Sequence, residues 1–160
     1  MLFVKDPDGS YSPAPKKRVL TEANKLMGYQ LRRGASILSS ECAKAVIGCK
    51  LRAKQHEVFA CLFLDSQHRV LAFKEIFTGT INHTTVHPRE VVREALQLNA
   101  AAIILAHNHP SGSIQPSTQD IALTRTLADI LKIVDVRILD HLIVGDEVTA
   151  FSDLGLLPEK

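Results

Sequence analysis

Features that define several large protein classes are missing from this sequence. It has no apolar run long enough to cross a lipid bilayer, so we expect no membrane contact. Met1–Val4 is followed at once by the polar segment Lys5–Gly9, which is not the pattern of a secretory signal peptide. The three cysteines, Cys42, Cys49 and Cys61, are odd in number and lack CxxC spacing. We therefore expect a cytoplasmic protein whose thiols are reduced and mostly buried.

A strong net charge is also absent. Nineteen lysines and arginines against 17 acidic residues give a formal charge of +2, which makes no strong electrostatic case for nucleic-acid binding. Internal repeats and low-complexity tracts are lacking as well. What remains is a chain of 160 residues with 46% hydrophobic content, typical of a soluble globular protein. That length is enough to bury one proper core.

The sequence divides into a short arm and one domain. Residues 1–35 are interpreted as a flexible basic N-terminal arm, and residues 36–160 as the domain. The first 15 residues contain Asp-Pro-Asp-Gly and Ser-Pro-Ala-Pro, which predict an extended, mobile segment. Lys16–Arg33 is basic and has the apolar spacing of a marginal amphipathic helix. Its basic face has two interpretations that stay open: a solvated or docking surface, or a nucleic-acid contact.

Helical and strand-like segments alternate within the domain. In order, we expect a helix from Ser40 to about Lys54, a strand at Val58–Leu64, a turn at Asp65–His68, a strand from Arg69 to about Thr80, a helix at Pro88–Leu98, a short buried strand at Ala100–Ala106, a helix from Ser117, and strands near Val136–Val144 and Glu147–Phe151. This alternation predicts an α/β fold with a mixed β-sheet flanked by helices.

The most informative segment follows the buried strand at Ala100–Ala106. If the strand continues, His107 and His109 lie two residues apart and point to the same face. Asp120 falls in the first turn of the next helix, where the helix dipole favours a carboxylate. Two imidazoles and one carboxylate leave a fourth position for water, which is the pattern of a catalytic zinc site. We therefore predict one zinc ion per chain.

The same residues have a purely structural interpretation. Ser117 to Asp120 is a variant of the capping box, with Ser117 as the N-cap and Asp120 returning the hydrogen bond. On this interpretation the serine and the aspartate only begin a helix, and the two histidines are polar loop residues. The two interpretations are compatible, because a metal-binding aspartate can also order the start of a helix.

The motif resembles that of a known superfamily. His107-x-His109, seven residues, Ser117, two residues and Asp120 match the JAMM motif of the JAB/MPN metalloproteins. The full string HNHPSGSIQPSTQD resembles the RadC-type branch, as do three further segments, Phe77–Thr80, Val86–Val91 and Asp140–Gly145. The resemblance covers roughly residues 36–157. It implies a cytidine deaminase-like fold and a zinc-dependent, metallopeptidase-like chemistry.

The resemblance also implies roles for two further residues. The family's catalytic glutamate stands two residues before the phenylalanine of a strand, which selects Glu57. Glu75 and Glu90 are its rivals. By the same resemblance, Ser117 donates a hydrogen bond to the developing oxyanion.

Two other histidines remain to be assigned. His87 precedes Pro88 at a helix start, so it either caps or packs at that helix or lies near the cleft. His141 follows Asp140 at a strand start, and we expect a structural role for it. Neither is expected to bind the metal.

Three functions follow as hypotheses. The leading one is a RadC-type zinc metallopeptidase or isopeptidase acting on a peptide or isopeptide substrate. The alternatives are a nucleic-acid-associated module in DNA repair or mobile-element biology, and a metal-binding partner domain that has lost catalysis. Longer RadC-type proteins carry a helix-hairpin-helix-like segment for which residues 1–35 have no room, and the insertions with which JAMM deubiquitinases grip ubiquitin have no counterpart. The sequence gives no indication of the oligomeric state.

Overall fold

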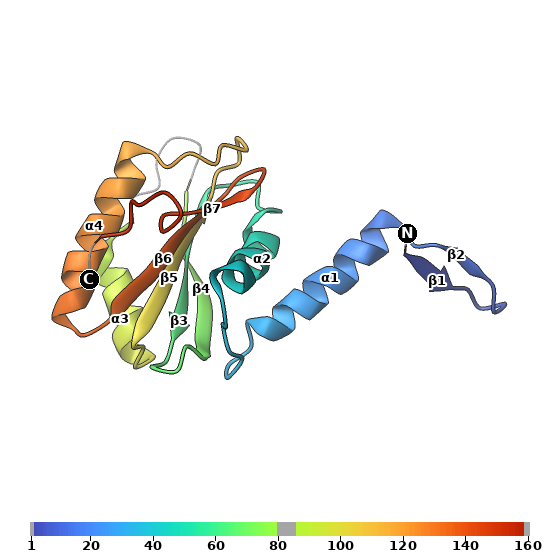
Figure 1. The fold of residues 1–160 in the computed structure, drawn as a ribbon, viewed down its shortest axis with the longest axis horizontal. Coiled ribbons are helices and arrows are strands. Elements are labelled where there is room, and N and C mark those ends of the chain that lie inside the picture. Colours follow the sequence, from blue (N-terminus) through green and yellow to red (C-terminus); the bar gives the residue numbers. More distant parts are fainter. Residues whose placement is uncertain (1, 80–85, 159–160) are drawn as a thin grey trace.

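The fold consists of an N-terminal hairpin and helix followed by an α/β domain (Figure 1). The computed structural model describes residues 2–79 and 86–158. Its elements in chain order are β1 (Phe3–Lys5), β2 (Tyr11–Pro13), α1 (Lys16–Gln30), α2 (Ser40–Leu51), β3 (Val58–Leu64), β4 (Val70–Thr78), α3 (Pro88–Gln97), β5 (Ala102–Asn108), α4 (Thr118–Ile133), β6 (Arg137–Val144) and β7 (Val148–Ala150).

The domain is built on a mixed five-stranded sheet with the strand order β4-β3-β5-β6-β7. Only β5 and β6 run parallel, and α4 connects them, as parallel neighbours require a crossover. All seven residues of β3 and all seven of β5 are buried. The sequence of β3, VFACLFL, is apolar throughout, and that of β5, AIILAHN, is apolar up to Ala106, which suits strands that are covered on both faces. The predicted α/β fold with a mixed, helix-flanked sheet is confirmed.

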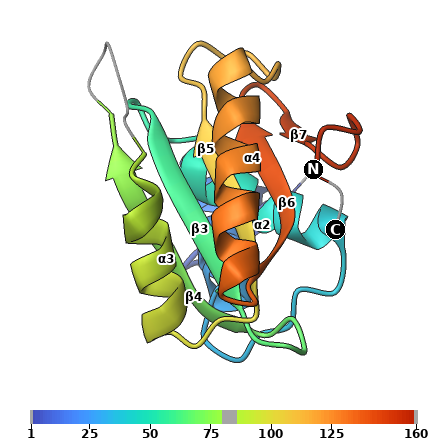
Figure 2. The same cartoon turned by 90° about the vertical axis from the view of Figure 1, so that its left-hand side faces the viewer.

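Two hydrophobic layers lie on opposite faces of the sheet. On one face, α2 packs Ala43, Ile47 and Leu51 against alternate strand residues. On the other, α3 and α4 cover the residues that point the opposite way, including Phe59 and Leu105. Figure 2 shows α3 and α4 side by side in front of the sheet, with α2 behind it. The alternation of strand side chains therefore decides which residues meet α4.

This arrangement places the motif at one end of the central strand. β5 ends at Asn108, and β3 runs antiparallel to it with Phe59 opposite His107. On its other side β6 pairs His141 with Leu105 and Ile143 with His107. The start of β3, the end of β5 and the start of α4 thus meet at the same edge of the fold.

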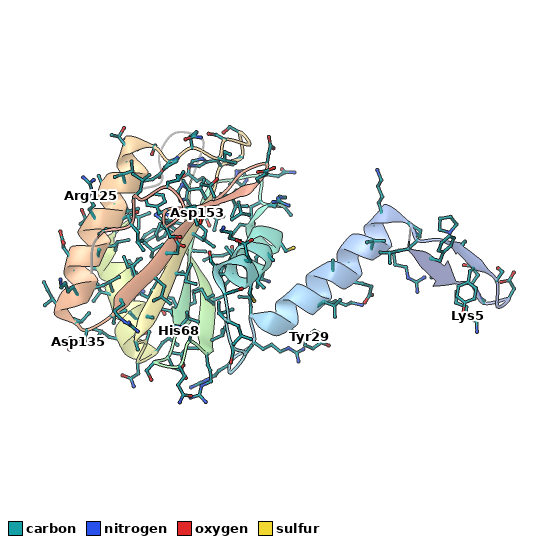
Figure 3. The ribbon with its side chains drawn as sticks, viewed as in Figure 1. Lys5, Tyr29, His68, Arg125, Asp135 and Asp153 are labelled. Atoms are coloured by element: carbon teal, nitrogen blue, oxygen red, sulfur yellow. The ribbon has the colours of Figure 1, made fainter. Side chains whose placement is uncertain are left out.

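The N-terminal arm differs from the sequence prediction of an extended, mobile segment. Phe3–Lys5 and Tyr11–Pro13 pair as an antiparallel hairpin. Its turn contains Gly9 in the left-handed region (φ 88°), and Asp6 and Ser10 close it through their backbone groups. Helix α1 follows and carries the hairpin away from the domain, and Figure 3 shows Lys5 and Tyr29 on this arm, clear of the sheet.

Most predicted boundaries within the domain agree with the structure to within two residues. The first domain helix is the exception: it was expected to reach about Lys54 but ends at Leu51, where the chain turns and the Lys54 N–H donates to the Leu51 carbonyl. Thr80, the predicted end of the second domain strand, lies outside the described residues. Within residues 2–79 and 86–158, every helix is too short or too polar to cross a bilayer.

Candidate metal centre

His107, His109 and Asp120 come together at the end of β5 and the start of α4. The two Nε2 atoms of the histidines are 2.8 Å apart. Asp120 places Oδ1 3.3 Å from His107 Nε2 and Oδ2 3.7 Å from His109 Nε2. Among the described residues, these three form a group whose ligand atoms could hold one metal ion. The structure thus brings together the three side chains that the sequence predicted as ligands.

The donor set fits a divalent zinc ion. Ligand atoms about 2.0–2.2 Å from a tetrahedral zinc stand roughly 3.3 Å from one another, which is the range of the three distances above. Two imidazoles and one carboxylate are also the ligand types of open zinc sites, where the fourth position is left to water or substrate.

His109 is oriented by the loop that follows it. Its Nδ1 atom lies 3.0 Å from the Ser113 carbonyl oxygen, which only accepts hydrogen bonds. Nδ1 therefore carries the proton, and the lone pair of Nε2 faces the other two ligands. The loop in turn rests on Gly145 at the end of β6, since a Cβ atom there would stand 2.4 Å from the carbonyl oxygens of Gly112 and Ser113.

Asp120 has the structural role that the capping-box interpretation predicted, and it faces the histidines as well. Ser117 is the N-cap of α4, and its Oγ accepts from the Asp120 N–H at 3.1 Å. In return Asp120 Oδ2 accepts from the Ser117 N–H and from the Ser117 hydroxyl, both at 2.7 Å. The capping box fixes the carboxylate while leaving Oδ1 directed at His107.

The electrostatics of the cluster favour a positive charge between the three ligands. Burial opposes ionisation of Asp120, but its contacts with the two imidazoles outweigh burial and hold the pKa of the carboxyl well below its usual range. The contact with Asp120 raises the pKa of His109, against the lowering effect of burial. A proton and a metal ion therefore compete for the same place.

His107 is buried, and two residues that the sequence did not assign to the site lie behind it: His141 contacts His107, and Thr124 contacts His141. Its Nδ1 atom lies 2.9 Å from His141 Nε2, and His141 Nδ1 lies 2.6 Å from the Thr124 hydroxyl. The Phe59 ring stacks on His107 with 6.4 Å between ring centroids. The sequence did carry a signal for these two residues: a histidine inside an apolar strand and a threonine on the buried stripe of a helix.

Glu57 lies next to the cluster. Extending the β3–β5 register beyond Phe59 and His107 sets Glu57 opposite His109. The Glu57 carboxylate is exposed, and after Asp120 and Ser113 it adds a smaller contribution that raises the pKa of His109. Within the described residues, its carboxylate has no hydrogen bond or ion pair, and it is therefore free to meet a ligand.

The two rival glutamates are engaged elsewhere. Glu75 on β4 forms an ion pair with Lys54 at 2.8 Å. Glu90 on α3 pairs with Arg93 at 2.6 Å. Neither belongs to the group of residues around the metal ligands.

Asn108 connects the motif to the segment that carries Glu57. The Val58 N–H donates to Asn108 Oδ1 at 2.8 Å, and Asn108 Nδ2 donates to the His56 carbonyl at 3.0 Å. These two hydrogen bonds hold the residues on either side of Glu57, namely His56 and Val58. The middle residue of the His-Asn-His string was not singled out from the sequence, because its partners Val58 and His56 are 50 and 52 residues away.

His87 occupies the N-cap position of α3, but its side chain makes no capping hydrogen bond. Its ring packs edge-on against Phe77, with 5.9 Å between centroids. His87 is not part of the candidate metal centre, and its predicted place near the cleft stays a prediction.

Comparison with known proteins agrees with this geometry. The family model described as "RadC-like JAB domain" matches residues 37–156. Similar proteins include a "UPF0758 protein" of Thioalkalivibrio sulfidiphilus, 50% identical over 149 residues, which are 93% of this chain and 67% of that protein. A "UPF0758 protein" of Vibrio cholerae is 46% identical over 90% of this chain and 91% of its own length. A third, from Nitrosococcus oceani, is 52% identical over 79% of this chain and 57% of its own length.

The printed names of these relatives state no activity, and this chain spans only part of the length of some of them. The family model, however, covers most of the chain and includes all three candidate ligands and Glu57. The protein therefore belongs to the RadC-like JAB domain family.

Proposed function

We propose that this protein is a zinc-dependent hydrolase of amide bonds, with one zinc ion per chain and a peptide or isopeptide as substrate. The observation that carries the proposal is the group of three candidate metal ligands with Glu57 beside it, whose carboxylate has no hydrogen bond or ion pair among the described residues. A purely structural metal site is usually closed by four protein ligands. On this proposal the three ligands leave a position for water, and Glu57 on the adjacent segment acts as the base.

The protein's own residues supply the proton transfers. When bound, zinc would polarise a carbonyl oxygen and lower the pKa of water to about 7. Glu57 accepts a proton as water adds to the carbonyl carbon, and it returns that proton to the leaving amine. Ser117 donates a hydrogen bond to the carbonyl oxygen as negative charge develops there, an effect often worth about 3 kcal/mol. The Ser117 hydroxyl now donates to Asp120, so it must turn toward the substrate.

A polar pocket beside His109 gives room for the substrate. It has a volume of about 250 Å³ and is open to solvent. Its lining includes the motif loop from Asn108 to Gly112 and the charged residues Arg52, Lys54 and Asp146. A lining with several polar and charged residues suits a polar chain such as a peptide better than an apolar small molecule.

The test separates the metal from the chemistry. Zinc-loaded protein is screened against peptide and isopeptide libraries, and Glu57→Gln is then compared with the wild type on a cleaved substrate. Because Glu57 is proposed as a base and not as a ligand, the variant should keep its zinc and lose about 10²–10⁴-fold in turnover. Elemental analysis and turnover are the two measurements.

Glu75→Gln and Glu90→Gln are the matched controls. Both remove the same charge from a glutamate that is already paired, so both should keep most of the activity. Cleavage by Glu57→Gln at the wild-type rate would refute the mechanism even if zinc is bound.

Nucleic-acid binding is the second candidate, because the cations of residues 16–33 are all exposed on the projecting arm, namely Lys16, Lys17, Arg18, Lys25, Arg32 and Arg33. Such binding would weaken steeply with salt and disappear when Lys16, Lys17 and Arg18 are replaced by glutamate. Binding of duplex DNA that is insensitive to these replacements would exclude the arm as the contact.

A further inference from the structure

A chain of three buried polar side chains runs from α4 to the metal centre. Thr124 and His141 are fully buried, and His107 is only 2% exposed. The Thr124 hydroxyl lies 2.6 Å from His141 Nδ1, and His141 Nε2 lies 2.9 Å from His107 Nδ1. Neither Thr124 nor His141 belongs to the group of candidate ligands, and Thr124 contacts Asp120 at its backbone carbonyl oxygen rather than at its carboxylate.

The direction of every hydrogen bond in this chain follows from its first member. Thr124 Oγ1 is also 2.7 Å from the Asp120 carbonyl oxygen, which only accepts. The single hydroxyl proton therefore goes to that carbonyl, and Thr124 Oγ1 accepts from His141. His141 must then carry its proton on Nδ1, which leaves the Nε2 lone pair facing His107.

The Nε2 lone pair of His141 decides the tautomer of His107. His107 has to donate from Nδ1 to satisfy it, so its Nε2 atom is left unprotonated toward His109 and Asp120. From these contacts we infer that Thr124 and His141 are positioning residues that hold His107 in the one tautomer able to bind the metal. The inference rests on the metal site of the proposed function but not on hydrolysis.

A merely structural role for His141 is the alternative. Its ring packs against Phe151 at 4.6 Å and edge-on against Phe59 at 5.9 Å, contacts that any flat side chain of this size would make. Packing alone places no requirement on which nitrogen carries the proton. The tautomer therefore distinguishes the two roles.

The first experiment reads the tautomer directly. Long-range ¹H–¹⁵N correlation spectra of protein labelled with ¹⁵N-histidine distinguish protonated from unprotonated ring nitrogens. The spectra are recorded at about pH 8, which is well above the ordinary histidine pKa. We expect neutral His141 with its proton on Nδ1, both in metal-free and in zinc-loaded protein. His141 protonated on Nε2 in either state overturns the inference, whether or not zinc binds or a substrate is cleaved.

The second experiment measures zinc affinity by competition with a chelator. Thr124→Val is nearly isosteric and removes only the hydroxyl, so His141 loses its fixed tautomer; affinity should fall about 10-fold, within the range usual for partners of ligands. Thr124→Ser restores the hydroxyl and should restore both affinity and tautomer. Thr126→Val is the matched control, because Thr126 makes the same hydroxyl-to-carbonyl contact, with Ala122 at 3.0 Å, on the exposed face of α4.

Variants of His141 test the other link. His141→Gln offers a carbonyl oxygen where Nε2 stood, so it should stay within a few-fold of the wild type, whereas His141→Leu should lose about 10–100-fold in affinity. Equal affinities for the Gln and Leu variants, or a Thr124→Val protein that matches Thr126→Val in both affinity and His141 tautomer, would contradict the inference. Failure of the wild type to bind zinc would instead count against the proposed function, and the spectra would still decide on the tautomer.

Discussion

The two histidines of the metal centre are held in different ways. His107 is buried in the core beneath α4, and its ring contacts His141 on β6, which Thr124 on α4 contacts in turn. His109 is partly exposed, and its ring contacts a backbone carbonyl four residues further along the chain. We call His107 with His141 and Thr124 the buried half of the site, and His109 with Ser113 the open half.

This difference has a functional meaning. The buried half is as rigid as the core around it, because any movement would leave polar groups without partners. The open half borders solvent and the polar pocket, where a substrate has to enter. One ligand is thus tied to the stability of the fold and the other to the conformation of a loop, and substitutions should separate the two.

The largest expected effect comes from removing each histidine in turn. His107→Ala and His109→Ala should both lose stoichiometric zinc, as should Asp120→Ala. Only His107→Ala should also destabilise the metal-free protein strongly, by about 2–4 kcal/mol, because it leaves a cavity and an unpaired His141. His109→Ala should cost under about 1 kcal/mol.

Elemental analysis and denaturant unfolding of metal-free protein measure these two effects. Equal loss of stability in the two histidine variants would break the comparison between the halves. Full zinc occupancy in any of the three variants would mean that the metal centre is assigned to the wrong residues.

The next effect tests the support of the open half. Gly145→Ala places a methyl group 2.4 Å from the Gly112 and Ser113 carbonyls, so the loop has to move. We expect a loss of about 1–3 kcal/mol from overpacking, and a loss of zinc affinity of about 10-fold because Ser113 shifts away from His109. Gly28→Ala is the control, since a Cβ atom at this position in the last turn of α1 meets no described atom within 4 Å. A Gly145→Ala protein that behaves like Gly28→Ala would show that the close approach is unimportant.

Acidity should affect the two halves in opposite directions. Burial lowers the pKa of His141 well below its usual value, so the unfolded chain takes up this proton first and stability falls as the pH drops below about 6.5. Asp120 raises the pKa of His109 in the folded protein. The stabilisation that His109 contributes is therefore present at low pH and is lost as the pH rises through its folded-state pKa. Each titration changes the slope of the unfolding free energy against pH by on the order of 1 kcal/mol per pH unit.

Unfolding of metal-free protein across pH 5–9, roughly the range around the ordinary histidine pKa, checks this prediction. The loss of unfolding free energy at acid pH should become smaller in His141→Leu. The loss of unfolding free energy with rising pH should become smaller in His109→Ala. If each variant changes the slope that belongs to the other half, the assignment of the two titrations is wrong.

The smallest effect is expected at the helix cap. Ser117→Ala removes the side chain that accepts from the Asp120 N–H, which should cost about 1 kcal/mol in unfolding free energy. If Ser117 also acts on the substrate, turnover should fall by more than this loss of stability explains. A melting curve and a rate measured on the same sample separate capping from catalysis, and an unchanged rate would leave Ser117 with the cap alone.

The secondary structure of the domain was largely predictable because it depends on local patterns. The buried strand at Val58–Leu64 has an unbroken apolar sequence, and Ser117 with Asp120 marks the start of α4. The hairpin at the N-terminus was missed, since Asp-Pro-Asp-Gly fits an open loop as well as a tight turn between paired strands. Composition does not distinguish these two, whereas the pairing of Phe3 with Pro13 does.

The group of three candidate ligands was predictable for the same local reason. His107 and His109 lie two residues apart at the end of a buried strand, and Asp120 follows eleven residues after His109 at a helix start. Glu57 was selected by resemblance to a family, because a lone glutamate before a strand carries no such pattern. Its position opposite His109 depends on the antiparallel register of β3 and β5.

By itself, then, the sequence determined the fold class, the grouping of the three candidate ligands and the helix cap, since each depends on residues that are near one another in the chain. Only the tertiary structure decided that Thr124 and His141 stand behind His107. These partners are separated by 17 and 34 residues, and they meet because β6 lies parallel to β5 and α4 packs across both on the same face. A hydrogen bond over such a separation depends on packing, which no local pattern encodes.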